Sequence, residues 1–264
     1  MSSASVPLRI VVLGSGTSVG VPMLGCQCEV CVSKDPRDKR FRPSVLLQYG
    51  SRNVLIDTTP DFRSQALRAG IDHLDAVLFT HAHADHIMGL DDVRPLSIGG
   101  RTAIPIYGSV ETIAAIHRSF AYAFDGEDRE SSIPRLETRV IDDTPFELFG
   151  LGITPVPVMH GKARIYGFRF GGAAYLTDQS DIPEGSVELL RRLDVLFLDA
   201  LRHRFHPTHT TLERALEWVR TLAPARAYFT HICHDLPHEE TESRLPPAVY
   251  LAYDTLEIVV GETP

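Results

Sequence analysis

The sequence predicts a protein of mixed α and β structure whose polar groups gather along one edge of a sheet. Short apolar runs typical of strands alternate with segments of helical character. Catalytic groups at the ends of several strands are typical of α/β-type enzymes. Five strand-like runs here are followed at once by an aspartate or a histidine, namely Asp57, His81, Asp178, Asp199 and His231. No repeat, low-complexity tract or linker is evident, so we expect one domain over residues 1–264.

The predicted elements of the first half follow in chain order. Branched and apolar residues between turn signals predict strands at residues 8–13, 44–48, 53–56, 76–79 and 104–107. The second and third of these form a hairpin about the turn at residues 49–52. Amphipathic spacing predicts a helix over residues 62–69, and residues 89–96 also look helical. Ser109 is a typical cap for a helix over residues 110–120.

The second half is predicted by the same signals. Several strands occupy residues 146–176, and a short helix near residues 187–192 precedes a strand at 195–199. A helix over 211–220, a strand at 227–229 and a last strand near Ile258 complete the chain. The glycine-rich turn at residues 14–20 lacks the G-x-G-x-x-G spacing, and no helical pattern follows it, which excludes a dinucleotide loop.

The composition is that of an ordinary globular protein, with 44% hydrophobic and 23% charged residues. Its formal net charge of −8 provides no basic footprint, so we do not expect a nucleic-acid partner. No apolar run approaches the roughly 20 residues that span a bilayer. Residues 1–7 lack the basic and apolar parts of a signal peptide. We therefore expect a cytoplasmic protein without a membrane partner, for which a homodimer is a possible assembly.

The stretch Thr80–His86 carries the strongest chemical signal in the chain. Residues two apart in extended chain point the same way, so His81 and His83 can bind one metal ion. Asp85 and His86 lie beyond the strand, where the chain turns, and can face a second ion. Imidazole with carboxylate suits zinc, iron or manganese better than calcium or magnesium. A solvated polar loop is the alternative, which three histidines and one aspartate in six positions make improbable.

The four cysteines are unevenly spaced, with Cys26, Cys28 and Cys31 together and Cys233 far away. A disulfide framework is not expected in a chain of this size in a reducing compartment, so metal binding by thiolate is the better interpretation.

Two further polar residues have ordinary interpretations. Asp57 could accept a hydrogen bond from a ligand imidazole, and it could equally cap a turn. His238 lies beside Glu239 and Glu240, and we expect it to be solvated.

One pattern of histidines and aspartates in the chain resembles the metal-ligand pattern of the metallo-β-lactamase superfamily. The residues are His81-x-His83-x-Asp85-His86, then His160, Asp178 and His231. The resemblance covers nearly the whole chain and implies an αββα sandwich of two mixed sheets flanked by helices. It also implies a binuclear hydrolase site. By this resemblance one ion is held by His81, His83 and His160, the other by Asp85, His86 and His231, and Asp178 bridges the two.

A narrower resemblance involves residues 14–22 and the run Gly25-Cys26-x-Cys28-x-x-Cys31. Both are similar to the phosphoribosyl 1,2-cyclic phosphate phosphodiesterases of the carbon–phosphorus lyase pathway. That family carries a structural zinc on three such cysteines and on a histidine that corresponds to His234. Cys233 is the alternative fourth ligand. His209 matches the proposed acid histidine of the family, and His206 competes for that role.

The resemblance implies a metal-dependent hydrolase with two divalent ions, zinc or manganese, in addition to the structural zinc. Two cations that share a water lower its pKa, and the resulting hydroxide attacks phosphorus in line while His209 protonates the leaving group. Asp85 and His209 are thus the expected catalytic residues. The expected substrate is a small phosphodiester such as phosphoribosyl 1,2-cyclic phosphate.

Other functions share the same ligands. Thioester hydrolysis does not account for the cysteine cluster. Processing of RNA 3′ ends needs a basic surface and a substrate-gripping insertion, and neither is evident in this acidic chain. A non-catalytic metal-binding sensor would have lost ligands, and no ligand of the pattern is missing.

Overall fold

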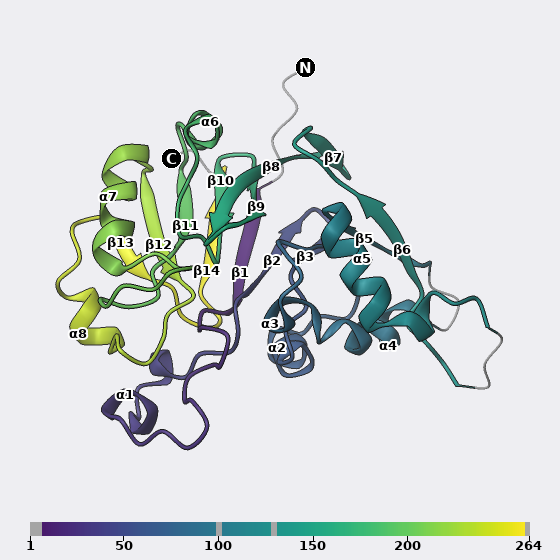
Figure 1. Ribbon diagram of the computed structural model, residues 1–264, viewed down its shortest axis with the longest axis horizontal. Coiled ribbons are helices and arrows are strands. Elements are labelled where there is room, and N and C mark those ends of the chain that lie inside the picture. The colour runs from purple at the N-terminus through teal and green to yellow at the C-terminus, as the bar shows by residue number, and fades with distance from the viewer. Residues whose placement is uncertain (1–6, 99–101, 128–130, 262–264) are drawn as a thin grey trace.

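The computed structural model describes residues 7–98, 102–127 and 131–261, in which two β-sheets lie between layers of helices (Figure 1). Residues 1–6, on which the expected absence of a signal peptide rests, lie outside the described residues. Within the described ranges, no helix has the length and apolar character that crossing a membrane requires. The αββα arrangement predicted from the sequence is confirmed.

Each sheet has seven strands, and the chain completes almost all of the first before it begins the second. The first sheet has the order β14-β1-β2-β3-β4-β5-β6 and the second β13-β12-β11-β10-β9-β8-β7. The first sheet consists of β1 Leu8–Gly14, β2 Ser44–Tyr49, β3 Arg52–Ile56, β4 Ala76–Leu78, β5 Ile104–Gly108, β6 Leu136–Val140 and β14 Glu257–Val260. The second consists of β7 Phe146–Leu148, β8 Leu151–His160, β9 Ala163–Phe170, β10 Ala173–Leu176, β11 Val195–Asp199, β12 Arg226–Thr230 and β13 Val249–Leu251.

Strand direction determines where the polar strand ends meet. Neighbouring strands from β3 to β6 are parallel, and so are neighbouring strands from β10 to β13. Because parallel strands share one carboxyl edge, the residues that follow them lie along the same edge of each sheet. Asp57, His81, Asp178, Asp199 and His231 occupy such positions.

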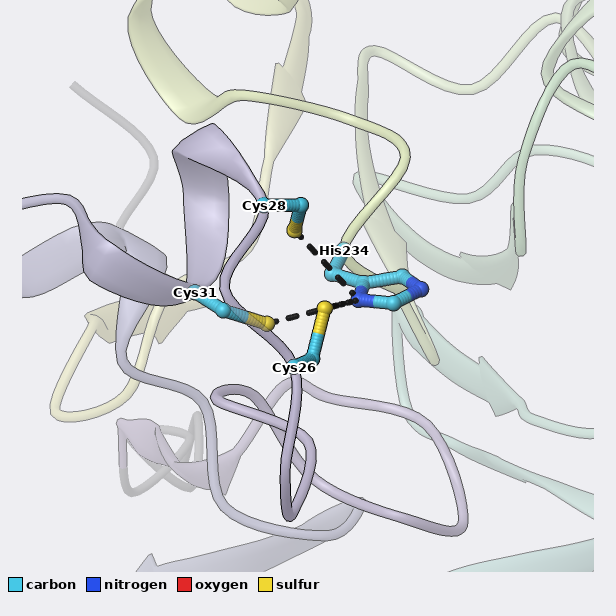
Figure 2. A group of neighbouring side chains, drawn as sticks. All are labelled: Cys26, Cys28, Cys31 and His234. Atoms are coloured by element: carbon cyan, nitrogen blue, oxygen red, sulfur yellow. Dashed lines mark hydrogen bonds between the residues drawn. The ribbon is translucent and has the colours of Figure 1, made fainter.

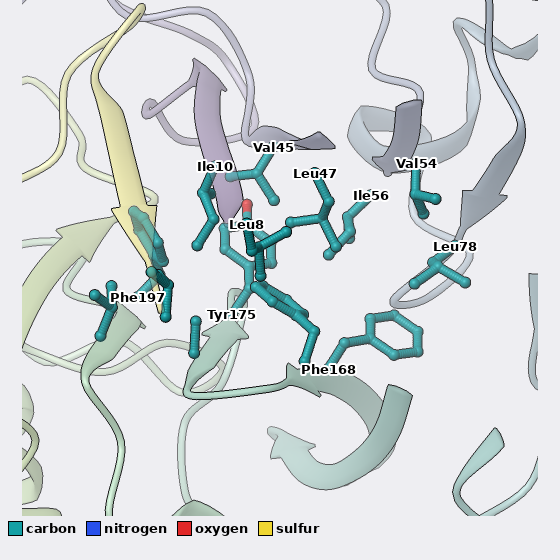
Figure 3. Close-up of a cluster of buried hydrophobic side chains, with 14 of the residues drawn as sticks. Leu8, Ile10, Val45, Leu47, Val54, Ile56, Leu78, Phe168, Tyr175 and Phe197 are labelled. Carbon is teal, nitrogen blue, oxygen red and sulfur yellow. The ribbon is translucent and has the colours of Figure 1, made fainter. Parts of the chain in front are cut away.

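The two sheets pack face to face through an apolar core. Alternate side chains of β1, β2 and β3 point at alternate side chains of β9, β10 and β11 (Figure 3). Ile10 and Leu47 from the first sheet share this core with Phe168, Tyr175 and Phe197 from the second. Because these side chains are almost fully buried, they hold the two sheets, and hence their carboxyl edges, at a fixed separation.

Helices cover the outer face of each sheet. The helices are α1 Glu29–Val32, α2 Phe62–Ala69, α3 Ala84–Ile87, α4 Arg94–Ser97, α5 Val110–Ser119, α6 Glu184–Val187, α7 Leu212–Leu222 and α8 His238–Glu242, with 3₁₀ turns η1 Pro36–Asp38, η2 Leu90–Val93, η3 Ala121–Ala123 and η4 Glu188–Leu190. Apolar residues of α2 and α5 pack on the first sheet, and those of α7 pack on the second. Ser109 caps α5 as predicted, because its hydroxyl accepts the Thr112 amide.

The sequence interpretation missed or misplaced several elements. Strands β6 and β13 and helix α8 were not predicted, and α6 begins before the expected residue 187. Asp85 and His86 lie in a turn of helix, α3, and not in an irregular turn. His238 was expected to be solvated, but it is 1% exposed and its ring lies against that of Tyr253. The acidic neighbours of His238 misled the interpretation, because they face solvent from the same short helix.

Candidate metal centres

The residues at the shared carboxyl edge include three with unusual backbone conformation. Asp57, Asp178 and His231 have φ angles of 65°, 59° and 58°, in the left-handed region that non-glycine residues rarely adopt. Asp57 and His231 immediately follow buried strands β3 and β12, and Asp178 follows β10 after Thr177. Strained positions of this kind cluster at functional sites, because the surrounding structure holds a side chain in a required direction.

The predicted histidine and aspartate ligands come together in two groups. Within each group the ligand atoms lie within 4.8 Å of one another. The first group is His81, His83 and His160, and the second is Asp85, His86, Asp178 and His231. Asp178 also lies within the same limit of His160, in a group with His209, so it is placed between the two sets. The structure therefore brings together the seven side chains that the sequence pattern singled out.

Several ligand atoms in these groups are buried and make no hydrogen bond with the rest of the described chain. They are His81 Nε2, His86 Nε2, His231 Nε2 and Asp85 Oδ2. The Nε2 atoms of His86 and His231 lie 3.1 Å from the two oxygens of Asp178. Buried polar atoms without hydrogen-bond partners are costly, and a cation would satisfy this donor set. Nitrogen and carboxylate donors in this number fit two divalent transition-metal ions.

A second layer of residues fixes the imidazole rings. The Nδ1 atom of His86 donates to Asp57 Oδ2 at 2.8 Å, and Thr80 donates to the same aspartate through its amide and its hydroxyl. The Nδ1 atom of His160 donates to the carbonyl of Thr208 at 2.8 Å. With Nδ1 occupied, Nε2 of each ring is available as the ligand atom. Of the two interpretations of Asp57, the structure supports the hydrogen bond to a ligand imidazole.

Burial and charge act in opposite directions on the ligands. Burial alone would raise the pKa of Asp178, but His231 and His86 outweigh it and hold that pKa well below its usual range. Burial lowers the pKa of His81 well below its usual value, and neighbouring His86 acts in the same sense. An ionised Asp178 and a neutral His81 are the forms in which these two groups bind a metal.

His209 and Asp199 form a dyad beside the second group. The Nδ1 atom of His209 donates to Asp199 Oδ2 at 2.8 Å, and Asp199 is completely buried at the end of β11. The rings of His209 and His231 are stacked with centroids 4.5 Å apart. His206 has no carboxylate partner among the described residues, and its Nδ1 accepts the hydroxyl of Thr208.

Asp199 was predicted only as one of the polar residues that follow strands, without a partner or a specific role. Its position directly after an apolar strand, ten residues before His209, was the available signal.

The three clustered cysteines meet His234, which follows β12, on one side of the molecule (Figure 2). The Nδ1 atom of His234 lies 3.3 Å from the Sγ atoms of Cys26 and Cys31 and 3.5 Å from that of Cys28. Three thiols and one imidazole around one point form a donor set of the structural-zinc type.

The fourth partner of this group is His234, because the thiol of Cys233 does not join it. The Cys233 sulfur instead accepts the amide of Asp235, and burial raises the pKa of the thiol to about 11.

A buried arginine joins the loop of the three cysteines to the loop that carries His231 and His234. Arg40 is 1% exposed, and it donates at 2.8 Å to the carbonyls of Cys233 and Leu236. It also donates to the carbonyl of Arg37 and to the carboxylate of Asp38, each at 3.1 Å. These bonds connect the segment that follows the cysteines to the segment between His231 and α8. Nothing in the local sequence distinguishes Arg40 from its neighbouring charged residues.

A cavity of about 690 Å³ opens beside the first group of histidines. Thr80, His81, His83 and His160 line it on the side of the metal ligands. The start of α5 and the segment after β6 line it on the side of the first sheet, and residues 163–166 of β9 line it on the side of the second. Pockets of roughly 300–1,000 Å³ accommodate small-molecule ligands, so this cavity is large enough for a substrate.

Comparisons with known proteins identify structures that share this fold. A crystal structure of a diphosphatase from the PhnP family is 52% identical, with a TM-score of 0.91, and covers 96% of this chain and 97% of that one. Zinc-bound PqqB from Methylobacterium extorquens is 20% identical, with a TM-score of 0.78, over 95% of this chain and 99% of that one, a likeness of fold alone.

A curated relative, an octanoyltransferase of Porphyromonas gingivalis, is 40% identical over 259 residues. The match covers 97% of this chain and 52% of the relative. The chain thus spans about half the length of the first curated relatives it matches. A family model described as a beta-lactamase superfamily domain matches residues 52–232. That match covers more than half of the chain, and the chain therefore belongs to the metallo-β-lactamase superfamily.

Proposed function

We propose that the protein is a binuclear metal-dependent hydrolase of small phosphodiesters. The observation that carries the proposal is the pair of His/Asp groups with orphaned buried ligand atoms, next to a substrate-sized cavity. The 52% identical diphosphatase of the PhnP family supports a reaction at phosphorus. The His209–Asp199 dyad supports a reaction in which a leaving group needs a proton.

The proposed metal content is two active-site ions, zinc or manganese, and one structural zinc. His81, His83 and His160 would hold one active-site ion, and Asp85, His86 and His231 the other, with Asp178 shared between them. Such ions supply a water of lowered pKa and neutralise charge on phosphate oxygens. Cys26, Cys28, Cys31 and His234 would hold the structural zinc and fasten the N-terminal loop beside His231.

We assign proton donation to His209. Its Nδ1 atom donates to buried Asp199, which fixes the ring and leaves Nε2 as the atom that can carry a proton to the leaving oxygen. His206 lacks a carboxylate partner of this kind among the described residues, so it is the weaker candidate for the acid.

Two substrate classes are each supported by a different observation. Phosphoribosyl 1,2-cyclic phosphate is the leading cyclic phosphodiester, on the resemblance of the cysteine run and His209 to the enzymes that act on it. A substrate with a diphosphate linkage is the second candidate, because the 52% identical relative is a diphosphatase. The name octanoyltransferase belongs to a relative about twice as long and does not carry acyl transfer over to this chain.

The test is hydrolysis of bis(p-nitrophenyl) phosphate, ribosyl cyclic phosphates and diphosphates by protein of known metal content. Metal-dependent turnover is expected, and Asp85→Asn should reduce it by at least about 100-fold through loss of a ligand. His209→Ala should reduce turnover of the sugar phosphates by about 10²–10⁴-fold.

His203→Asn is the matched control for these substitutions. His203 is an exposed histidine paired with Glu213, so its replacement should leave the rate unchanged. Metal-loaded protein that is inactive on every phosphoric ester would contradict the proposal.

A further inference from the structure

The cavity beside the first histidine group has two walls that the proposed chemistry does not use. One wall belongs to the first sheet, where the amide of Ile141 donates to the carbonyl of Gly108 and Val140 pairs with Gly108 in register. This pairing places the end of β6 next to the start of α5. The other wall is the first part of β9, residues 163–166, in the second sheet, and Figure 1 shows where β6, α5 and β9 lie.

The wall from the first sheet exposes two valines towards the cavity. Val110 is 59% exposed and Val140 is 60% exposed, and both line the cavity with half-buried Ile141. Single exposed valines are ordinary on a protein surface. Two that line one cavity beside a metal site form an apolar surface that a bound ligand can cover.

The wall from the second sheet presents a planar cation held in place. The guanidinium of Arg164 is bonded to the carboxylate of Asp143, and it donates to the hydroxyl of Tyr166 at 3.3 Å. It also lies over the Tyr166 ring, 5.2 Å from the centroid, while the side chain remains 48% exposed. A guanidinium plane fixed in this way is a stacking surface for an aromatic ring.

The wall from the first sheet also carries two acidic residues. The carboxylates of Glu111 and Asp142 line the cavity. Carboxylates accept hydrogen bonds from hydroxyl and amino groups such as those of a sugar or a base. The cavity therefore suits a planar ring that carries a hydroxylated sugar.

We infer that this cavity binds a nucleoside-sized group of the substrate, with a planar base between Val110–Val140 and Arg164 and sugar hydroxyls near Glu111 and Asp142. The substrate class would then be nucleoside phosphodiesters or nucleoside diphosphate derivatives, in preference to phosphoribosyl 1,2-cyclic phosphate, which has no base. This inference rests on the proposed function, because it assigns the non-reacting half of the same substrate.

The first experiment measures binding and does not require turnover. Isothermal titration calorimetry of the zinc-loaded protein compares thymidine 5′-monophosphate with methyl phosphate, which carries the same phosphate without base or sugar. We expect the nucleotide to bind at least about tenfold more tightly, the gain typical of one stacked base. Equal affinity for the two phosphates, or no binding of either, overturns the inference.

Substitutions then identify the walls. Val110→Ser and Val140→Ser should each weaken the binding of thymidine 5′-monophosphate by about three- to tenfold. The affinity for methyl phosphate should not change. Val259→Ser is the matched control, because Val259 is a similarly exposed valine, 41%, on the opposite edge strand of the same sheet. An equal effect on both phosphates would show that the valines do not contact the nucleoside.

Arg164→Lys separates stacking from charge. Lysine keeps a cation for Asp143 but lacks a planar group on which a base can stack. The affinity of the protein for the nucleotide should therefore fall several-fold. Full affinity in Arg164→Lys, with loss in Arg164→Met, would assign this wall to an anionic group and overturn the nucleoside assignment.

Turnover measured on the same samples separates the two proposals. A preference for thymidine 5′-monophosphate without hydrolysis of any phosphoric ester contradicts the proposed reaction but supports the assignment of the pocket. Metal-dependent hydrolysis without that preference supports the proposed reaction and contradicts the assignment of the pocket.

Discussion

Replacement of Arg40 by methionine should destabilise the protein strongly, although Arg40 touches no metal ligand side chain. Methionine keeps the length and apolar stem of the side chain but removes four hydrogen bonds. The carbonyls of Cys233 and Leu236 lose a donor, and Asp38, 5% exposed, loses its buried cation. Removal of one member of a buried ion pair costs about 3–5 kcal/mol, because the remaining charge is left without compensation.

The size of the chain converts this cost into a melting temperature. In domains of roughly 150–250 residues, 1 kcal/mol corresponds to about 2–4 °C, so Arg40→Met should melt about 6–20 °C below the wild type. Guanidinium unfolding followed by the fluorescence of Trp218, the single tryptophan, measures the same loss as a free energy.

Two further variants make the result specific. Asp38→Asn in the Arg40→Met background removes the uncompensated charge but keeps an oxygen for the His238 amide, so it should recover part of the loss. Arg9→Met removes an exposed pair with Glu257 and should cost at most about 1 kcal/mol. If Arg40→Met unfolds within about 1 kcal/mol of the wild type, the buried guanidinium does not join the two loops as described.

Three other predictions concern the dyad, the cysteine group and acid stability. Asp199→Asn should lower kcat on a sugar cyclic phosphate by about 10²-fold or more and on bis(p-nitrophenyl) phosphate by less than about tenfold, since nitrophenolate leaves without a proton; an equal loss on both refutes general acid catalysis. Cys31→Ser should remove one of three metal equivalents and lower the melting temperature, and unchanged metal content would exclude a zinc there. The hydrogen bonds from Arg37 lower the pKa of Asp35 to about 2, so this carboxylate stabilises the fold above its unfolded pKa near 4 and loses that contribution as the pH falls from about 4 to about 2. Asp35→Asn should therefore be less stable than the wild type at pH 7 and equally stable at pH 2, and a constant difference across that range would refute the assignment.

Much of the site could be predicted from the sequence because its residues follow strands. Short apolar runs identify strands, and parallel strands bring the residues after them to one edge, so Asp57, Asp178 and His231 could be grouped before any coordinates. The Thr80–His86 motif could be recognised because its residues are adjacent in the sequence. Its identification did not depend on whether Asp85 and His86 lie in a turn or in helix α3.

Other parts of the site depend on contacts between distant segments, which no local pattern reports. The partnership of Asp199 with His209 requires the chain to fold back after β11. The burial of Arg40 and His238 depends on how the loop after β12 packs against the cysteine loop. Charged neighbours are a poor guide there, because burial is decided by tertiary packing. Strand β6 was missed because its exposed residues alternate with half-buried ones and show no apolar run.

The central claim is tested most directly by metal content and phosphodiesterase activity measured on one preparation. We predict three metal equivalents per chain, hydrolysis of bis(p-nitrophenyl) phosphate that chelation abolishes, and recovery on addition of zinc or manganese. Three bound metals with no hydrolysis of any phosphodiester or diphosphate would leave the superfamily membership intact and contradict the proposed reaction.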